Sequence, residues 1–419
     1  MGSEPSTNLK PNLHLKGVNL ALFFVVQCLM ICGNMARKLL VDRFSFRGFI
    51  MLKQYSRRLI WTSICLLSVT PSANATGFNF WESSSLNSSL AAANGAWARD
   101  ASVLALAPSS MTQLQDTQLS ATVNFYSVAT DYEIFGQEAQ YEVANPVPSG
   151  FFVLPMRNNW HFGVGIYSRT AADISVPSIP LVNPDEVRLS PILISLTPSF
   201  AYSWGPLSLG VSLEYIHADY GFDQIKCRPV AGCEEINLEG KNHGWSGNLS
   251  ATWQINERIT LALSHQLPSD FDDEYLQVAL PSITRFYMSA RMTESIYWHN
   301  SYSYSQWEDK GMSFTDYPDN LGLLVGQTNS NRYATGLDYQ LDKWRFGLGF
   351  SIDQAIDSFG GNDYRYRAGG GYQLAERWGL DFNFMYENYA AKSANIGGTP
   401  VVKVQNKGSS FSLGLRYLF

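Results

Sequence analysis

The last segment of the chain alternates strictly between apolar residues and small or polar ones. Its apolar residues share one face of a predicted strand, and they are Phe411, Leu413, Leu415, Tyr417 and Phe419. Ser410, Ser412, Gly414 and Arg416 share the other face, because successive side chains of a strand point to opposite sides. A chain that ends on its apolar face with an aromatic residue is typical of outer-membrane β-barrels, whose outward face meets lipid and whose inward face meets a wet lumen. We interpret the apolar face of this strand as a membrane-assembly signal.

The same period of two recurs in earlier parts of the chain. It is clearest over residues 207–214, 245–253, 333–341, 344–351 and 378–386. Short stretches of turn-forming or charged residues separate such segments at 157–159, 205–206, 256–257, 293–294, 342–343 and 376–377. Longer polar connections lie at about 127–149, 168–189, 216–243, 266–280, 305–331, 353–363 and 387–408.

Six short turns and seven long connections join fourteen strands, with both ends of the sheet on the short-turn side. An even strand number with short turns on one side is the rule for bacterial outer-membrane barrels. We therefore predict an all-β fold, a 14-stranded antiparallel transmembrane β-barrel over residues 115–419. A secreted β-sandwich or a propeller is disfavoured, because the second face of each segment carries Gly, Ser, Asp, Asn and Arg where a sandwich would place its apolar core.

The first 75 residues have the features of segments that are removed before the protein matures. A basic region that includes Lys53 and Arg57 precedes an apolar run at 59–69, and a small-x-small site follows at 73–75. Residues 51–75 therefore read as a signal peptide with cleavage before Thr76. Residues 1–50 are then an upstream extension; an inner-membrane anchor is the alternative for its apolar run at 18–32, which is short for a membrane helix.

The chain after residue 75 is acidic. The first 75 residues hold nine Lys/Arg and two Asp/Glu, which leaves 21 basic and 34 acidic residues and a net charge of −13 in the remainder. That balance disfavours a nucleic-acid partner. Aromatic residues make up 14% of the whole chain, as the girdles at the two membrane interfaces of a barrel require.

Two of the five cysteines lie beyond the predicted signal peptide. They are Cys227 and Cys233, which bracket Arg-Pro-Val-Ala-Gly. A small-loop disulfide between them suits an oxidising compartment, and two free thiols are the alternative. A metal site would need more ligands nearby, so none is predicted.

Residues 76–114 do not alternate, and their small residues suit a compact plug better than a strand. This segment contains Gly77-Phe78, Ser83-Ser84-Ser85, Ala98-Arg99-Asp100-Ala101-Ser102, Pro108 and Met111. With these motifs, and with the stretch 160–167, Leu280-Pro281 and Trp307 further on, the chain resembles the FadL/TodX (OMPP1) family of outer-membrane transporters of long-chain fatty acids and other hydrophobic compounds. The resemblance extends over nearly all of residues 76–419 in layout.

The resemblance implies that residues 76–114 form an N-terminal hatch that plugs the barrel. It implies hatch or gating roles for Arg99, Asp100, Ala107, Pro108 and Ser109, although the family's Asn-Pro-Ala is Ala-Pro-Ser here. It further implies passive uptake across the outer membrane of a Gram-negative bacterium. The ligand would bind from outside, move to a pocket beside the hatch and leave sideways through the wall into the bilayer.

The same resemblance sets the expected partners. They are a long-chain fatty acid or similar hydrophobic small molecule, outer-membrane lipid and lipopolysaccharide, and the barrel-assembly machinery during biogenesis. The protein is expected to act as a monomer and to need no cofactor.

A ligand with a carboxylate head group needs a cation near the lumen wall. Strand parity turns several arginines inward, namely Arg285, Arg291, Arg345, Arg365, Arg367 and Arg416. Arg365 and Arg367 follow a long connection and Arg285 lies at a similar height, so these three are our head-group candidates. The alternative is that each arginine pairs with a lumen carboxylate such as Asp338, Asp381 or Glu214.

Other functions are compatible with parts of the pattern. Transport of aromatic or alkane hydrocarbons would use the same fold without a head-group cation. A general porin would not begin with a hatch-like segment, and an adhesive barrel would carry longer outer loops. An outer-membrane lipase would need a catalytic constellation, whereas His161, His265 and His299 are scattered along the sequence. We therefore expect a transporter that is not an enzyme.

Overall fold

A computed structural model describes the segments that form the barrel and its plug. The described residues are 80–134, 136–170, 174–176, 186–228, 232–272, 276–314, 328–357, 360–396 and 399–419. The chain divides into two compact units, residues 1–71 and 72–419, and all described residues belong to the second. The predicted upstream extension (1–50) and signal peptide (51–75) lie outside the described residues.

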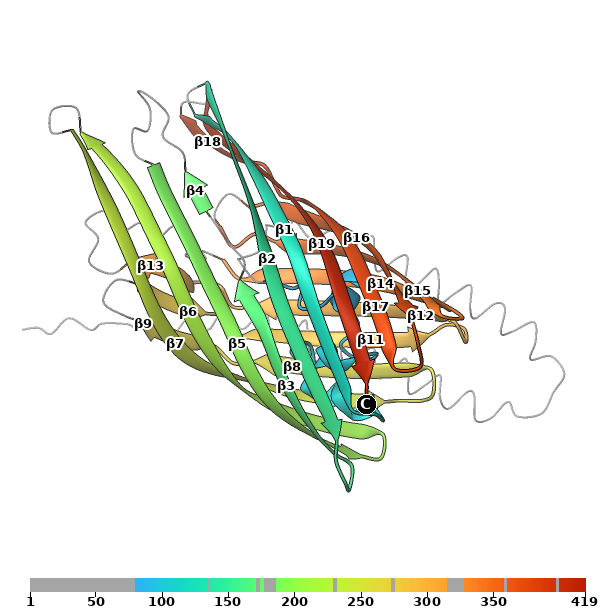
Figure 1. Cartoon of the computed structure of the whole chain (residues 1–419). Helices are drawn as coiled ribbons and strands as arrows, with labels where there is room; N and C mark the ends of the chain where they lie inside the picture. Colours follow the sequence, from blue (N-terminus) through green and yellow to red (C-terminus); the bar gives the residue numbers. More distant parts are fainter. Residues whose placement is uncertain are drawn as a thin grey trace, which may run out of the picture. The chain divides into compact units, whose positions relative to one another are not determined.

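Within these segments, fourteen strands form one closed antiparallel sheet (Figure 1). They are β1 (Gln118–Ile134), β2 (Gln137–Pro155), β3 (Trp160–Thr170), β5 (Glu186–Trp204), β6 (Leu207–Arg228), β7 (Gly232–Gln254), β8 (Ile259–Gln266), β11 (Ile283–Arg291), β12 (Ile296–Ser305), β14 (Ser330–Leu341), β15 (Trp344–Gln354), β16 (Asn362–Gln373), β17 (Trp378–Asn388) and β19 (Thr399–Leu418). Each strand pairs with the next in this order, and β1 pairs with β19 over its whole length, which closes the barrel. The predicted 14-stranded barrel is confirmed.

Five further strands lie in the described parts of the longer connections. β4 (Ile174–Val176) pairs with β5, and β18 (Lys392–Ile396) pairs with β19. β9 (Ser269–Asp272), β10 (Leu276–Leu280) and β13 (Gly311–Phe314) form a small separate sheet. Of these five, only β4 and β18 are hydrogen-bonded to the barrel sheet.

The six short turns fall where the sequence predicts them, but two of the predicted long connections are continuous strands. β1 and β2 pair up to Ile134 and Gln137, and β6 and β7 pair up to Arg228 and Gly232. The outer parts of these hairpins have no continuous apolar face, so their sequence pattern predicts a polar connection instead of two strands. Where water meets both faces of a hairpin, backbone pairing continues without the alternation that lipid imposes.

A belt of apolar side chains surrounds the barrel on its outer face. Phe411, Leu413 and Leu415 are exposed there, whereas Ser410 and Ser412 of the same strand are buried against the lumen side. Aromatic rings gather near the short turns, for example Trp344 tilted at 45° against Tyr372 with centroids 4.5 Å apart. An apolar outer belt of this kind is stable only in contact with lipid.

An arginine in the middle of this belt is expected to destabilise the barrel. Leu348 of β15 is 59% exposed on the outer face, and a Leu348→Arg variant places an unpaired charge in hydrocarbon at a cost of about 2 kcal/mol. Leu341→Arg is the matched control, because Leu341 ends β14 beside a short turn, where the cost falls below about 1 kcal/mol. Urea unfolding in phospholipid vesicles measures both, and equal losses of stability would contradict the orientation of the belt.

The hatch consists of three short helices that pack inside the barrel. They are α3 (Ser85–Ser89), η1 (Ala101–Ala105) and η2 (Pro108–Gln113), coloured blue to cyan inside the strands of Figure 1. Ser84 and Asp100 cap α3 and η1 with their side-chain oxygens, and Pro108 opens η2. No helix among the described residues is long and apolar enough to cross a membrane.

An apolar cluster fixes the hatch against one arc of the wall. Val103, Leu104 and Met111 of the hatch are buried against Phe151 of β2 and Tyr167 of β3. Burial of apolar side chains of this size contributes about 1.5–3 kcal/mol each. This cluster places the hatch directly beside the inward-facing residues of β3.

Candidate functional site: a pocket between hatch and wall

On one side, the hatch is joined to the wall by neutral hydrogen bonds. The Ser109 N–H donates to Ser250 Oγ at 2.8 Å, and the Ser109 and Thr252 hydroxyls lie 2.7 Å apart. Thr112 Oγ1 donates to Ser208 Oγ at 2.8 Å. β6 and β7 thus present short hydroxyl side chains to η2, as the polar face of an alternating strand allows.

On the other side, arginines of the wall hold the hatch. Arg332 Nη2 donates to the Ala91 carbonyl at 2.8 Å, and Arg345 Nη1 donates to Ser89 Oγ at 3.2 Å. Arg367 Nη2 pairs with Glu82 Oε1 at 2.5 Å. Charge-assisted bonds are roughly twice as strong as neutral ones, so these arginines hold the segment from Glu82 to Ala91 more strongly than its neutral bonds to Ser149 and Thr122 do.

The carboxyl of Glu82 is ionised in this position. Burial raises the pKa of Glu82, but the charges of Arg367, Arg365 and Arg332 together lower it by more than burial raises it. The pKa of Glu82 therefore lies below its ordinary value. The Glu82–Arg367 contact is therefore an ion pair at neutral pH. The second carboxylate oxygen, Oε2, accepts a hydrogen bond from the backbone N–H of Trp81 at 3.0 Å.

Arg99 and Asp100 have different structural positions within the hatch. Arg99 Nε lies 3.4 Å from Asp338 Oδ2, and Arg99 Nη1 donates to Gln340 Oε1 at 2.9 Å. Asp100 accepts from the N–H and the hydroxyl of Ser102 at 2.9 and 2.5 Å. Burial raises the pKa of the Asp100 carboxyl, and neighbouring Asp381 raises it further. Arg99 joins the hatch to the wall, whereas Asp100 caps η1.

The remaining predicted gating residues lie at the start of η2. Ala107 is fully buried, Pro108 begins the helix, and Ser109 makes the contacts to β7 described above. The asparagine amide that the family places before this proline is absent, and the hydroxyl and N–H of Ser109 make the polar contacts to the wall. A gating role for these residues stays a prediction.

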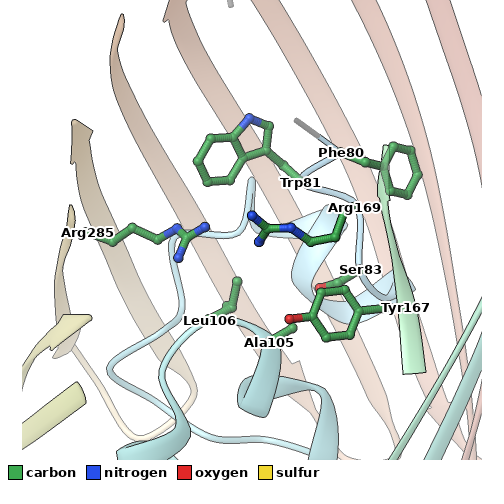
Figure 2. A pocket seen from close by; sticks show the side chains of 8 residues that line it. All are labelled: Phe80, Trp81, Ser83, Ala105, Leu106, Tyr167, Arg169 and Arg285. Atoms are coloured by element: carbon green, nitrogen blue, oxygen red, sulfur yellow. The ribbon is translucent and has the colours of Figure 1, made fainter. Parts of the chain in front are cut away.

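A pocket lies between the hatch and two strands of the wall (Figure 2). Its lining consists of Phe80, Trp81, Ser83, Ala105 and Leu106 of the hatch, Tyr167 and Arg169 of β3, and Arg285 of β11. The cavity measures about 30 Å³, room for two or three water molecules at roughly 10–15 Å³ each. An acyl chain can enter only if hatch side chains move.

The two arginines of the pocket differ in their partners. Figure 2 shows their guanidinium groups pointing toward each other below the Trp81 indole. Arg169 Nε lies 3.5 Å from Glu214 Oε1. Arg285 is 6% exposed, and its Nε and Nη1 have no hydrogen-bond partner. Among the described residues, no carboxylate forms an ion pair with Arg285, so the pocket holds one uncompensated cation.

Aromatic rings complete the pocket around this cation. The Arg285 guanidinium lies 5.3 Å from the centroid of the Trp81 ring, and the ring of Tyr167 stacks on Phe151 with centroids 5.7 Å apart. A cation over an aromatic face gains about 0.5–2 kcal/mol, which partly offsets the cost of burying the charge. The pocket therefore combines apolar walls with a single positive charge.

The other two predicted head-group residues are ion-paired. Arg365 pairs with Asp353 and with Glu387, and Arg367 pairs with Glu82. Of the three candidates, Arg285 alone lines this pocket. Whether any of the three binds ligand stays a prediction.

Arg169 and Trp81 belong to the pocket but are not among the predicted site residues. Residues 167 and 169 are two positions apart, so alternation along β3 turns Tyr167 and Arg169 to the same side. The sequence would therefore have indicated an inward-facing Arg169 if the predicted strand had been extended beyond residue 167. The pairing of β3 with β5 shifts register between Ser168 and Thr170, which makes the end of this strand hard to recognise. Trp81 precedes a short helix and follows no periodic pattern.

The three histidines have separate structural partners. His161 Nε2 lies 3.0 Å from the Leu114 carbonyl, His265 Nδ1 lies 2.9 Å from Thr284 Oγ1, and His299 Nδ1 lies 2.8 Å from Ser289 Oγ. Within the part of the chain that the structure describes, no group of three or more His, Cys, Asp or Glu side chains is placed to hold a metal ion.

Cys227 and Cys233 lie opposite each other at the tip of the β6–β7 hairpin. Cys233 is disulfide-bonded, and the β6–β7 register sets Cys227 directly across from it. A bond between Cys227 and Cys233 stays our prediction. Alkylation without prior reduction should leave both residues unmodified.

Comparison with known proteins identifies relatives of the whole barrel and hatch. A family model described as "Outer membrane protein transport protein (OMPP1/FadL/TodX)" matches residues 66–419. No curated protein sequence matches the chain significantly.

Several solved structures have the same fold. A FadL homologue from Pseudomonas aeruginosa superposes with a TM-score of 0.70 at 15% identity, over 82% of this chain and 100% of the other. The Pseudomonas putida toluene transporter TodX gives a TM-score of 0.62 at 11% identity, over 84% and 100%. The Ralstonia pickettii toluene transporter TbuX gives 0.59 at 13% identity, over 81% and 99%. At these identities the likeness shows the fold.

Proposed function

Because the chain belongs to the OMPP1/FadL/TodX family of outer membrane transport proteins, we propose that the hydrophobic compounds it carries are long-chain fatty acids or similar apolar carboxylates. The protein is a β-barrel of the bacterial outer membrane with a transport rather than an enzymatic function. The choice of ligand class depends on one observation: the pocket beside the hatch holds a buried arginine, Arg285, without a carboxylate partner among the described residues.

A buried charge without a partner is costly. Such a charge is retained where a ligand of opposite charge pairs with it. A carboxylate suits this role because it can accept two hydrogen bonds from one guanidinium. The apolar lining around Arg285, with Leu106, Phe80 and Trp81, suits the alkyl chain that follows such a head group. The combination supports an amphiphilic anion over a neutral hydrocarbon.

The energetics allow uptake without an energy source. Transfer of an alkyl chain out of water gains about 0.8 kcal/mol per methylene, so fifteen methylenes gain about 12 kcal/mol in total. Loss of translational and rotational freedom and of hydration takes back roughly 4–15 kcal/mol. The remaining affinity is moderate, which permits both capture from outside and release into the bilayer.

The pocket borders a place where the barrel wall is incompletely paired. The ladder between β2 and β3 ends at Gly150 and Ile166, although both strands continue. Beyond that point the N–H of Phe80 in the hatch donates to the carbonyl of Arg169 at 3.2 Å. We propose that ligand leaves sideways at this end of β3 when the hatch moves.

Uptake in cells tests the proposed ligand class. A Gram-negative strain that lacks its own outer-membrane fatty-acid transporter is supplied with this protein and with radiolabelled oleate or toluene. Oleate uptake is expected to rise well above that of the empty strain. A rise for toluene alone would reject the proposal and favour the alternative, a carrier of aromatic hydrocarbons, which the three aromatic rings of the pocket would also suit.

A further inference from the structure

Three arginines of the wall converge on one acidic residue of the hatch. Arg332 of β14 and Arg365 and Arg367 of β16 are each at most 4% exposed. Glu82 is paired directly with Arg367, and Arg365 and Arg332 also act on its charge. We call Glu82 and these three arginines, with Asp353 and Glu387, the arginine cluster.

Counting only the groups that these ion pairs join, the three guanidinium charges are matched by three carboxylates only while Glu82 is in place. Arg332 Nε pairs with Asp353 Oδ1 at 2.7 Å, and Arg365 joins Asp353 to Glu387. The ion pairs thus connect three guanidinium groups to three carboxylates, one of which belongs to the hatch. Without Glu82, these ion-paired groups of the wall alone carry one net positive charge, a match for one carboxylate.

The cluster is in contact with the ligand pocket through Trp81. The Trp81 ring lies over Arg332 at 4.6 Å and over Arg285 at 5.3 Å, so one indole separates the cluster from the uncompensated cation of the pocket. The backbone N–H of Trp81 also donates to Glu82 Oε2 at 3.0 Å. A ligand that displaces the Trp81 side chain from Arg285 therefore disturbs the residue that is bonded to Glu82.

We propose that Glu82 is a built-in competitor of the ligand, whose carboxylate fills an anion site that the ligand's carboxylate takes when the hatch moves. This inference rests on the proposed function, since it assumes an anionic ligand. The site takes an alkyl monocarboxylate: Arg367 supplies a guanidinium N–H that already holds a carboxylate oxygen, and Ser351 Oγ lies 3.1 Å from Arg367 Nη1 and keeps that side chain in place. The head group would pass from Arg285 to Arg367 as Trp81 and Glu82 leave.

Removal of the competitor tests this directly. A Glu82→Gln variant keeps the shape of the side chain and one accepting oxygen, but it removes the charge and turns the second oxygen into an NH2 donor. Apparent affinity is reduced by the fraction of molecules whose site is competent, so removal of a competitor that fills the site nine-tenths of the time tightens binding about tenfold. Isothermal titration of the purified full-length mature barrel in detergent measures dodecanoate and, as the uncharged probe of equal length, dodecanol.

The expected result is about tenfold tighter binding of dodecanoate by Glu82→Gln, with dodecanol affinity within about twofold of wild type. Arg367→Gln in the same background should remove the gain. Glu133→Gln is the matched control, because Glu133 is ion-paired to Lys403 on the outer hairpin at 2.8 Å, away from the lumen cluster; it should leave dodecanoate binding unchanged. Heat-modifiability on a gel verifies that each variant is a folded barrel.

Each other outcome overturns the inference. Unchanged dodecanoate binding by folded Glu82→Gln shows that Glu82 does not compete, and an equal gain for dodecanoate and dodecanol shows that the variant merely loosens the hatch. The proposed function fails separately: it is rejected if wild-type protein binds dodecanoate no better than dodecanol, whatever Glu82→Gln does.

Discussion

An Arg285→Gln variant is expected to lose most of its affinity for fatty acids while it keeps that for neutral compounds of equal length. Truncation of one partner of a buried charge pair costs about 2–5 kcal/mol, which is roughly 30-fold or more in the dissociation constant. Dodecanol, which has no charge to place beside residue 285, should bind within about threefold of its wild-type affinity. Titration of both compounds against the purified barrel measures the split.

Two further variants of β11 make this result specific. Arg285→Lys keeps the positive charge but not the paired N–H donors and should recover part of the dodecanoate affinity. Arg291→Gln removes the same charge nearer the short-turn end of the same strand, outside the pocket lining, and should bind dodecanoate as wild type does. Equal losses for Arg285→Gln and Arg291→Gln would mean that the lumen attracts anions only through its general charge.

The barrel could be predicted because lipid imposes a simple rule on every strand. Leu413 and Phe411 face out and Ser412 faces in for the same reason that Leu348 and Phe346 face out, so parity is informative wherever a strand crosses the membrane. The rule fails at the hairpins of β1–β2 and β6–β7, which continue beyond the belt with water on both faces. The number of strands is still predicted correctly, because it is counted from the short turns.

The pocket could be predicted only in part because its chemistry depends on pairings between distant segments. Parity places Arg285, Arg365 and Arg367 in the lumen equally well. What separates them is whether a carboxylate lies nearby: Glu82 for Arg367, Glu387 for Arg365, and none among the described residues for Arg285. Glu82 lies 285 positions from Arg367 in the sequence, in a segment without periodicity, so no local pattern reveals the pair.

The two sides of the hatch are attached by different kinds of contact, and this difference indicates which part can move. η2 is joined to β6 and β7 by short neutral hydrogen bonds and close backbone contact. The segment from Glu82 to Ala91 is held by arginines of β14, β15 and β16, in addition to neutral bonds from Ser149 and Thr122 to the backbone of Ser83 and Ser85. An anionic ligand competes with carboxylates for arginines and does not compete for hydroxyl pairs. The α3 side is therefore the part of the hatch that ligand can release, and η2 is its fixed point.

The fixed point depends on a glycine, and a Gly210→Ala variant is expected to unseat η2. A Cβ at position 210 would lie 2.3 Å from the Ser109 backbone nitrogen and 2.7 Å from the carbonyl carbon of Pro108. Backbone cannot rotate away as a side chain can, so overpacking of about 1–3 kcal/mol adds to the loss of the two Ser109 hydrogen bonds, at about 1 kcal/mol each. The hatch should then seal the lumen poorly, and ion conductance in planar bilayers should rise well above that of wild type.

Gly221→Ala on the same strand is the matched control for this effect. Apart from its chain neighbours, no described residue has an atom within 4 Å of a Cβ built at Gly221. This variant therefore makes the same change of residue in β6 without touching the hatch and should conduct as little as wild type. If Gly210→Ala is as tight as Gly221→Ala, η2 is not what seals the lumen, and the seal must then depend on the α3 side. In that case Glu82→Gln, rather than Gly210→Ala, would raise the conductance. The charged contacts of the α3 side would then fix the hatch to the wall, and η2 would be the part that moves.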